Sequence, residues 1–146
     1  MRIRCGGEDF TDQSGALWGR DRFATSGRLS PPKAEPVDGT EDDALYQGGR
    51  SFDSANPKPH GYRIPVPPGR YRVTLGFAEV SLKEPEKRAF DVLLEGKVVQ
   101  ADYEPKWRKA ENLTFEVIVE DGHLEIEFVT KTFNSKISAI AIEVLR

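Results

Sequence analysis

One stretch, residues 61–94, constrains the fold of this chain more than any other part of the sequence. Within it, residues 71–77 alternate apolar with polar or small side chains, and residues 90–94 alternate again. Successive side chains of a β-strand point to opposite faces, so a period of two predicts strands with one apolar face. Pro67, Pro68 and Gly69 mark a turn between two such segments. We therefore expect this stretch to form the centre of an antiparallel sheet that is packed on one side.

The same alternation recurs along most of the chain. Strands are predicted at residues 1–5, 61–66, 71–80, 88–95, 98–103, 113–120, 124–128 and 137–145. Glu95-Gly96-Lys97 predicts a tight connection, and Asp121-Gly122 predicts a two-residue hairpin. No segment carries a sustained apolar stripe of helical period. The sequence therefore predicts an all-β fold, an antiparallel β-sandwich or jelly roll.

Size and charge limit the classes of partner. A chain of 146 residues fits a single compact domain over 1–146, and its net charge of −3 argues against a nucleic-acid partner, which needs a basic face. Residues 1–6 lack the apolar core of a signal peptide, and no apolar run is long enough for a membrane helix, so no membrane partner is expected. The lone Cys5 cannot form an internal disulfide and is expected to be a buried core residue. These features leave the native compartment open.

Residues 19–43 show no periodicity and hold three prolines, and residues 56–59 read as another loop. An unstructured stretch of about 25 residues is unusual in a compact domain and is often functional. We expect residues 19–43 to wrap the sheet surface and to contribute to a rim.

The titratable residues do not predict an enzyme. His60 and His123 lie far apart without metal-ligand spacing, and no cofactor is expected. The acidic run at residues 41–43 has two interpretations: a calcium site near Asp42 and Asp43, or a solvated turn in which a carboxylate caps the following segment. Glu79 and Asp91 lie among the predicted core strands, either as an acid pair of the glycosidase type or as structural anchors.

The aromatic residues Tyr46, Trp107 and Phe133 lie in or next to loops rather than at clearly alternating core positions. Rings displayed on the loops of a β-sandwich can stack on sugar faces, while nearby Asn, Asp or Arg side chains bond the hydroxyls. The alternative is that each ring seals the edge of the sandwich.

Several motifs, taken in order, resemble those of the malectin family. They are Ile3-Arg4-Cys5-Gly6-Gly7; Phe10-Thr11-Asp12 with Gly15 and Trp18; Asp42-Asp43-Ala44-Leu45-Tyr46-Gln47 with Arg50; Phe77-Ala78-Glu79; Arg88-Ala89-Phe90-Asp91-Val92; and Asn134-Ser135-Lys136-Ile137-Ser138-Ala139-Ile140. The resemblance implies a galactose-binding-like or jelly-roll sandwich that binds an oligo- or polysaccharide, such as a glucan, without catalysis. It also implies a secreted or extracytoplasmic location and a glycoside hydrolase domain as a neighbour in a larger parent protein.

The sugar-contacting positions of that family are only partly kept. Two adjacent aromatics of the family pocket are Ser81 and Leu82 here, and a sugar-contacting Asp is Phe133. Among these positions, Tyr46 alone matches. The ligand-binding residues that we predict are Tyr46, Arg50, Trp107, Phe133 and Asn134. Because rings and a carboxylate are replaced, the alternative function is a structural or protein-interaction module that has lost the sugar site.

Overall fold

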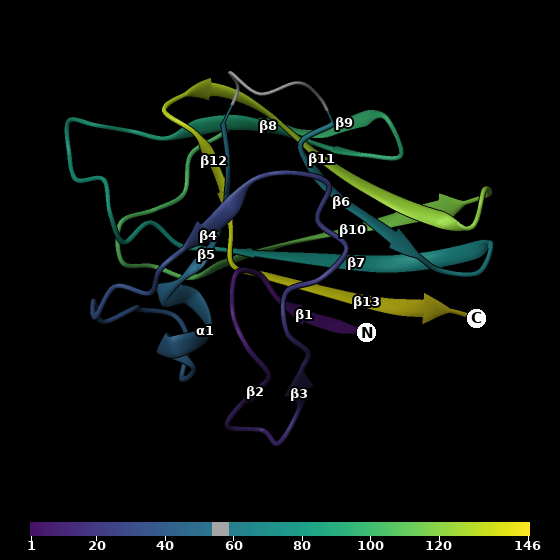
Figure 1. Ribbon diagram of the computed structural model, residues 1–146, viewed down its shortest axis with the longest axis horizontal. Coiled ribbons are helices and arrows are strands. Elements are labelled where there is room, and N and C mark those ends of the chain that lie inside the picture. The colour runs from purple at the N-terminus through teal and green to yellow at the C-terminus, as the bar shows by residue number, and fades with distance from the viewer. Residues whose placement is uncertain (54–58) are drawn as a thin grey trace.

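The structure is a computed structural model and describes residues 1–53 and 59–146. It consists mainly of two four-stranded antiparallel sheets that pack face to face (Figure 1). The first sheet has the order β1 (Arg2–Arg4), β13 (Ala139–Leu145), β7 (Gly69–Phe77) and β10 (Glu111–Val119). The second has the order β6 (Gly61–Pro65), β11 (His123–Thr132), β8 (Ala89–Leu94) and β9 (Lys97–Tyr103). The predicted all-β antiparallel sandwich is confirmed.

Smaller elements lie around the two large sheets (Figure 1). A three-stranded sheet has the order β12 (Ser135–Ile137), β5 (Gly49–Phe52) and β4 (Arg28–Ser30). A two-stranded ribbon joins β2 (Phe10–Thr11) to β3 (Leu17–Trp18), and the one-turn helix α1 spans Asp43–Gln47. No helix within the described residues is long and apolar enough to cross a membrane.

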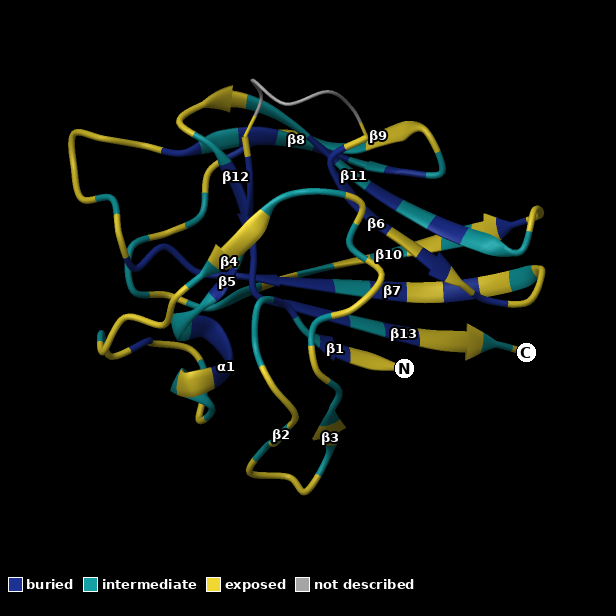
Figure 2. Cartoon of the chain, viewed as in Figure 1, coloured by how far each residue is buried: buried dark blue, intermediate teal, exposed yellow. Residues whose placement is uncertain are grey.

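The core lies between the two large sheets, where the buried positions of facing strands meet (Figure 2). The ring of Phe77 in β7 lies 4.8 Å from that of Tyr103 in β9, and Phe90 in β8 lies 5.7 Å from Phe128 in β11, measured between ring centroids. Each such ring stabilises the fold by roughly 1.5–3 kcal/mol through removal of apolar surface from water. Cys5 is buried in this core, as predicted, and burial raises the pKa of its thiol.

Two predictions about strand pairing are wrong. Residues 61–94 do not form one sheet, because β6 and β8 lie in the second sheet and β7 in the first. Asp121-Gly122 does not close a hairpin, because it connects β10 of the first sheet to β11 of the second. The apolar faces of two alternating strands can face each other across a core as well as lie side by side, so alternation alone does not choose between these arrangements.

The tight connection at residues 95–97 is confirmed. Strands β8 and β9 pair directly, with Leu94 opposite Lys97. Glu95 and Gly96 both have positive φ angles, 51° and 79°, as a two-residue hairpin of this kind requires.

The segment at residues 19–43 is more ordered than predicted, because it contains β4, which pairs with β5. A three-residue strand is too short to show a period. The predicted capping of the helix is also wrong: Asp42 makes no cap hydrogen bond, and its Oδ1 accepts the Gln13 backbone N–H at 2.9 Å. Most of the predicted loop at 56–59 lies outside the described residues.

Candidate functional site

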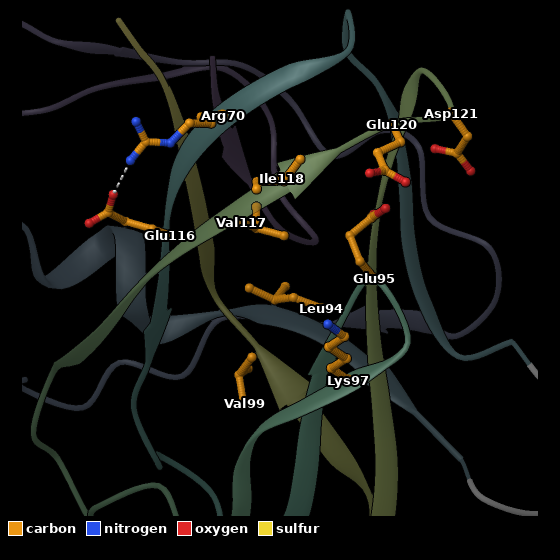
Figure 3. Close-up of a pocket in the computed structure, with 10 residues that line it drawn as sticks. All are labelled: Arg70, Leu94, Glu95, Lys97, Val99, Glu116, Val117, Ile118, Glu120 and Asp121. Carbon is orange, nitrogen blue, oxygen red and sulfur yellow. Dashed lines mark hydrogen bonds and ion pairs between the residues drawn. The ribbon is translucent and has the colours of Figure 1, made fainter.

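Two surface hollows lie at opposite ends of β7. The first, which we call the edge-strand hollow, has a volume of about 670 Å³ and lies where the outer strands β9 and β10 leave the sandwich open. It is lined by Arg70, Leu94, Glu95, Lys97, Val99, Glu116, Val117, Ile118, Glu120 and Asp121 (Figure 3). None of the predicted ligand-binding residues lines it.

Carboxylates dominate one side of the edge-strand hollow. Glu95, Glu120 and Asp121 gather there, while Arg70 and Glu116 form an exposed ion pair of 3.4 Å on the other side (Figure 3). Partial burial raises the pKa of Glu95, and the negative charges of Asp121 and nearby glutamates raise it further. Glu95 lies in the turn between β8 and β9, and Glu120 and Asp121 lie in the connection between β10 and β11.

The second hollow, which we call the loop-side hollow, has a volume of about 500 Å³. It is lined by Arg28, Leu29, Ser30, Pro31, Lys33, Ser51, Asp53, Ser81, Leu82, Arg88, Phe133 and Asn134. The structure thus brings together two of the five predicted residues, Phe133 and Asn134, with the two positions where the family aromatics are replaced, Ser81 and Leu82.

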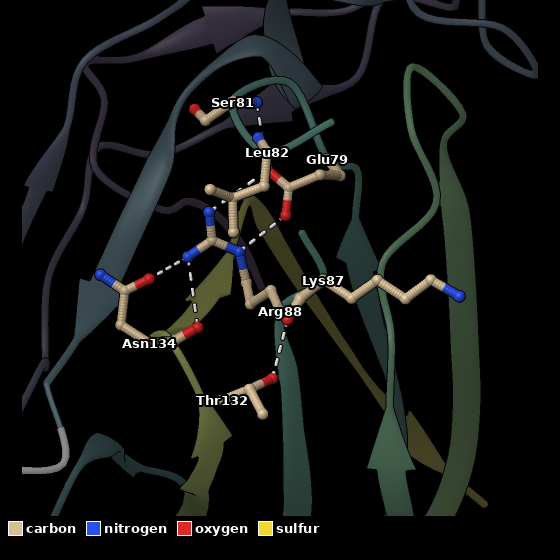
Figure 4. Close-up of polar contacts among 7 residues, drawn as sticks. All are labelled: Glu79, Ser81, Leu82, Lys87, Arg88, Thr132 and Asn134. Atoms are coloured by element: carbon tan, nitrogen blue, oxygen red, sulfur yellow. Dashed lines mark hydrogen bonds and ion pairs between the residues drawn. The ribbon is translucent and has the colours of Figure 1, made fainter. Parts of the chain in front are cut away.

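A buried ion pair supports the wall of the loop-side hollow. Glu79 and Arg88 are only 3% and 6% exposed, and Nε of Arg88 donates to Oε1 of Glu79 at 2.8 Å (Figure 4). The other guanidinium nitrogens donate to Glu79 Oε2 and to the carbonyl and side-chain oxygens of Asn134. Charge-assisted bonds of this kind are stronger than neutral ones, so the pair fixes Asn134 in place.

The same carboxylate also orders residues 81–82. Oε2 of Glu79 accepts the backbone N–H groups of Ser81 and Leu82, both at 3.1 Å. Burial alone would raise the pKa of Glu79, but Arg88 and these two amides together hold it below its usual value. Glu79 is therefore a structural carboxylate that shapes the turn beside the hollow.

Phe133 is the aromatic residue of this hollow. Its side chain is 56% exposed, and its backbone has a φ angle of 59°, in the left-handed region that non-glycine residues rarely adopt. It lies with Asn134 in the two-residue connection between β11 and β12, and Thr132 just before it donates to the Lys87 carbonyl at 2.8 Å (Figure 4). Backbone strain that displays an exposed ring is a common mark of a functional position.

Tyr46 lies apart from this hollow. It is buried on the outer face of the first sheet in a second apolar cluster that contains Val37, Leu45, Ala78, Val80 and Ala139. Its hydroxyl donates to Oδ1 of Asn112 at 2.8 Å, and burial raises its pKa. Gly76 of β7 makes room for the ring, since a Cβ there would lie 3.1 Å from Cε1 of Tyr46.

Arg50 and Trp107 also lie outside the loop-side hollow. Arg50 donates through Nη1 to Asp21 at 2.8 Å and through Nε to the Ser26 carbonyl at 2.8 Å, so it ties β5 to the preceding loop. Trp107 lines a neighbouring hollow of about 350 Å³ that shares Leu82 and Arg88 with the loop-side hollow. The ammonium of Lys83 lies 5.4 Å from the centre of its ring.

Sequence reasoning missed the cationic residues of the loop-side hollow. Arg28 and Lys33 fall in the stretch without periodicity, and Arg88 was noted only as part of a family motif. Among the described residues, no group of three or more His, Cys, Asp or Glu side chains is placed to hold a metal ion. Asp43 instead accepts the Val37 backbone N–H at 3.2 Å.

Comparison with known proteins assigns the sequence to a family. The sequence matches the family profile described as "Malectin domain" over residues 1–142. The chain belongs to the malectin domain family. It is 28% identical over 145 residues to Malectin-B of Xenopus laevis, a match that covers 93% of this chain and 51% of that protein. The chain thus spans about half the length of the curated relatives that it matches.

Solved structures share the fold. A β-glucuronidase of Bacteroides uniformis is similar over 100% of this chain and 18% of its own, with a TM-score of 0.86 and 19% identity. The ANX1 ectodomain from Arabidopsis thaliana is similar over 97% of this chain and 47% of its own, with a TM-score of 0.80 and 15% identity. At these identities, the likeness concerns the fold alone.

Proposed function

We propose that this domain binds a carbohydrate without catalysing a reaction on it, and that the loop-side hollow is the binding site. Membership of the malectin domain family supports the class of ligand. The observation that carries the choice of site is the exposed ring of Phe133 beside the firmly held Asn134, at a hollow of about 500 Å³. Volumes of this order are typical of small-ligand sites.

The chemistry of the lining suits a sugar ring. Leu29, Pro31, Leu82 and Phe133 offer apolar surface for the C–H face of a sugar, and an aromatic ring there can stack on it. Hydroxyls and an amide that can bond sugar hydroxyls come from Ser30, Ser51, Ser81 and Asn134. Since Oδ1 of Asn134 accepts from Arg88, its amide nitrogen is the group that would donate to a ligand.

The other predicted ligand-binding residues, Trp107, Tyr46 and Arg50, lie outside the loop-side hollow and would have different roles. Trp107 borders the neighbouring hollow and would extend the surface for a longer chain of sugar units. Tyr46 and Arg50 would hold the supporting elements α1 and β5 in place, since their polar groups already bond Asn112 and Asp21.

The carboxylates of Glu79 and Asp91, which could suggest a hydrolase, are already bonded to other groups of the protein. Both oxygens of Glu79 bond Arg88 or backbone amides, and its side chain is buried. Asp91 accepts the Asp102 backbone N–H at 2.9 Å and pairs with Lys131 at 3.7 Å. Neither carboxylate is placed as a free general acid or nucleophile, which supports binding without catalysis.

A second candidate function is that of a protein-interaction module. Ile118 on the outer strand β10 is 61% exposed and lines the edge-strand hollow, and Val98 on the outer strand β9 is 55% exposed. Exposed apolar side chains on unpaired strand edges favour contact with another protein.

The experiment is a glycan array followed by titration calorimetry on the wild type, Phe133→Ala and Ile118→Ser. Carbohydrate binding by the wild type and Ile118→Ser, with weaker binding by Phe133→Ala, is the expected result. If no glycan binds, or if Ile118→Ser and not Phe133→Ala loses binding, the proposal is wrong. The melting temperature of each variant controls for unfolding.

The domain would act as an accessory module of a larger secreted or extracytoplasmic protein. The fold of this chain occupies 18% of the β-glucuronidase chain, so a domain of this kind does occur within a glycoside hydrolase. Fractionation of source cells with an antibody against the domain would show whether the native protein is extracytoplasmic, as proposed, or cytosolic, which would contradict it.

A further inference from the structure

Cationic side chains gather at the loop-side hollow, although the chain as a whole is acidic. Arg28, Lys33 and Arg88 line it against a single acid, Asp53, whereas the net charge of the chain is −3. The edge-strand hollow shows the opposite balance, with four carboxylates against Arg70 and Lys97. The positive charge is therefore local and is not a property of the whole surface.

Arg88 contributes little to this charge, because Glu79 neutralises it. Arg28 and Lys33 differ: both are exposed, and neither forms an ion pair with any residue that the structure describes. Arg28 on β4 and Lys33 just beyond it thus line the hollow as two exposed cations, and among the described lining residues Asp53 is the one carboxylate beside them.

A third cation lies behind the hollow. Lys136 in β12 is opposite Ser51 in β5, which in turn is opposite Arg28 in β4, so the three side chains share one face of the small sheet. Lys136 is 3% exposed, and its Nζ has no hydrogen-bond acceptor within the described part of the chain. Burial, reinforced by the charges of Arg88 and Lys33, lowers the pKa of Lys136 to about 8. Positive potential therefore extends beneath this face.

We infer that the loop-side hollow selects an acidic sugar, with a uronic acid carboxylate held by Arg28 and Lys33 and the sugar ring against Phe133 and Leu82. This inference rests on the proposed function and specifies its substrate class. A guanidinium can donate two parallel hydrogen bonds to a carboxylate, and an ammonium adds a point charge. A neutral sugar would leave both cations without a partner.

The test is titration calorimetry with two matched pairs of trisaccharides. One pair is a β-1,4-linked glucuronate trimer and cellotriose, and the other is trigalacturonate and its carboxyl-reduced form. Within each pair, the ligands differ only in the C6 carboxylate. We expect at least one acidic trimer to bind about tenfold or more tightly than its neutral partner, which corresponds to one charge-assisted contact. Added salt should weaken the acidic ligand more than the neutral one.

The variant Arg28→Gln/Lys33→Gln should remove this preference, so that the acidic trimer binds no more tightly than its neutral partner. Arg70→Gln, which removes an exposed cation from the edge-strand hollow, is the matched control and should retain the preference.

Three results would overturn the inference. If neutral trimers bind as tightly as acidic ones, the preference for acidic sugars is wrong and the proposed function stands. If a sulfated neutral trisaccharide binds more tightly than both uronates, the carboxylate assignment is wrong. If neither these ligands nor any glycan of the array binds, the proposed function fails as well.

Discussion

The edge-strand hollow and the loop-side hollow lie at opposite ends of β7 and are built in different ways. The edge-strand hollow is the larger, but its polar lining includes the exposed Arg70–Glu116 pair and carboxylates in the connections that follow β8 and β10. Behind the loop-side hollow stands the buried Glu79–Arg88 pair, which fixes a turn and an amide (Figure 4). The volume of a hollow is therefore a weaker indication of a binding site than the contacts that hold its lining residues in place.

The largest contrast expected is in stability. Arg88→Met would leave the Glu79 carboxylate buried without its partner and should reduce the free energy of unfolding by about 3–5 kcal/mol. Arg70→Met removes a solvated partner and should cost less than about 1 kcal/mol. Urea denaturation of both variants measures the difference.

A double variant sharpens this comparison. Glu79→Gln/Arg88→Met removes both charges, so its loss of stability should be well below the sum of the two single losses. If Arg88→Met and Arg70→Met reduce the free energy of unfolding equally, the buried pair does not stabilise its hollow more than the exposed pair does.

A smaller effect should appear with pH. The folded-state pKa of Lys136 is about 8, against 10.5 for an ordinary lysine, so between these values the unfolded chain holds a proton that the folded chain has released. The contribution of Lys136 to the free energy of unfolding should therefore rise by about 2 kcal/mol between pH 8 and pH 10. The raised pKa of the buried Cys5 thiol acts in the opposite direction above about pH 9, and the raised pKa values of the buried Tyr62 and Tyr103 do so above about pH 10.

Lys136→Met is the control for this pH effect. The difference between wild type and variant isolates the lysine, because Cys5 and the tyrosines are common to both. If both proteins show the same slope between pH 8 and pH 10, the ammonium is not desolvated in the way described.

Substitutions at the two hollows should also differ in their effect on ligand affinity, by less than the stability differences above. Phe133→Ala should weaken carbohydrate binding by about two- to tenfold, since an aromatic contact contributes about 0.5–1.5 kcal/mol. Ile118→Ser, which changes an exposed apolar side chain at the other hollow, should leave the affinity within about twofold. Calorimetry with the tightest glycan of the array gives both values, and a reversed order would exchange the roles of the hollows.

The smallest effect concerns the tyrosine of the second apolar cluster. Tyr46→Phe keeps the ring over Gly76 and removes the bond to Asn112, so it should cost about 1 kcal/mol of stability and leave affinity unchanged. Loss of affinity with unchanged stability would give Tyr46 a direct role in binding.

The sequence allowed the sandwich to be predicted because alternation in segments such as residues 71–77 and 124–128 reports which side chains face a core. It could not assign β7 and β8 to different sheets, because both arrangements bury the same side chains. The position of Phe133 outside the alternating pattern and the family motif at Asn134 predicted these two residues, which the structure brings together at one hollow. Arg28 and Lys33 could not be found, since their place depends on the pairing of β4 with β5, 20 residues or so away in sequence.

The most direct test of the central proposal is a titration of the isotope-labelled domain with its tightest glycan, followed by amide NMR shifts. We expect the largest shifts at Ser81, Leu82 and Asn134, with Arg70, Lys97 and Ile118 unchanged. Large shifts at the edge-strand hollow and none at the loop-side hollow would contradict the account.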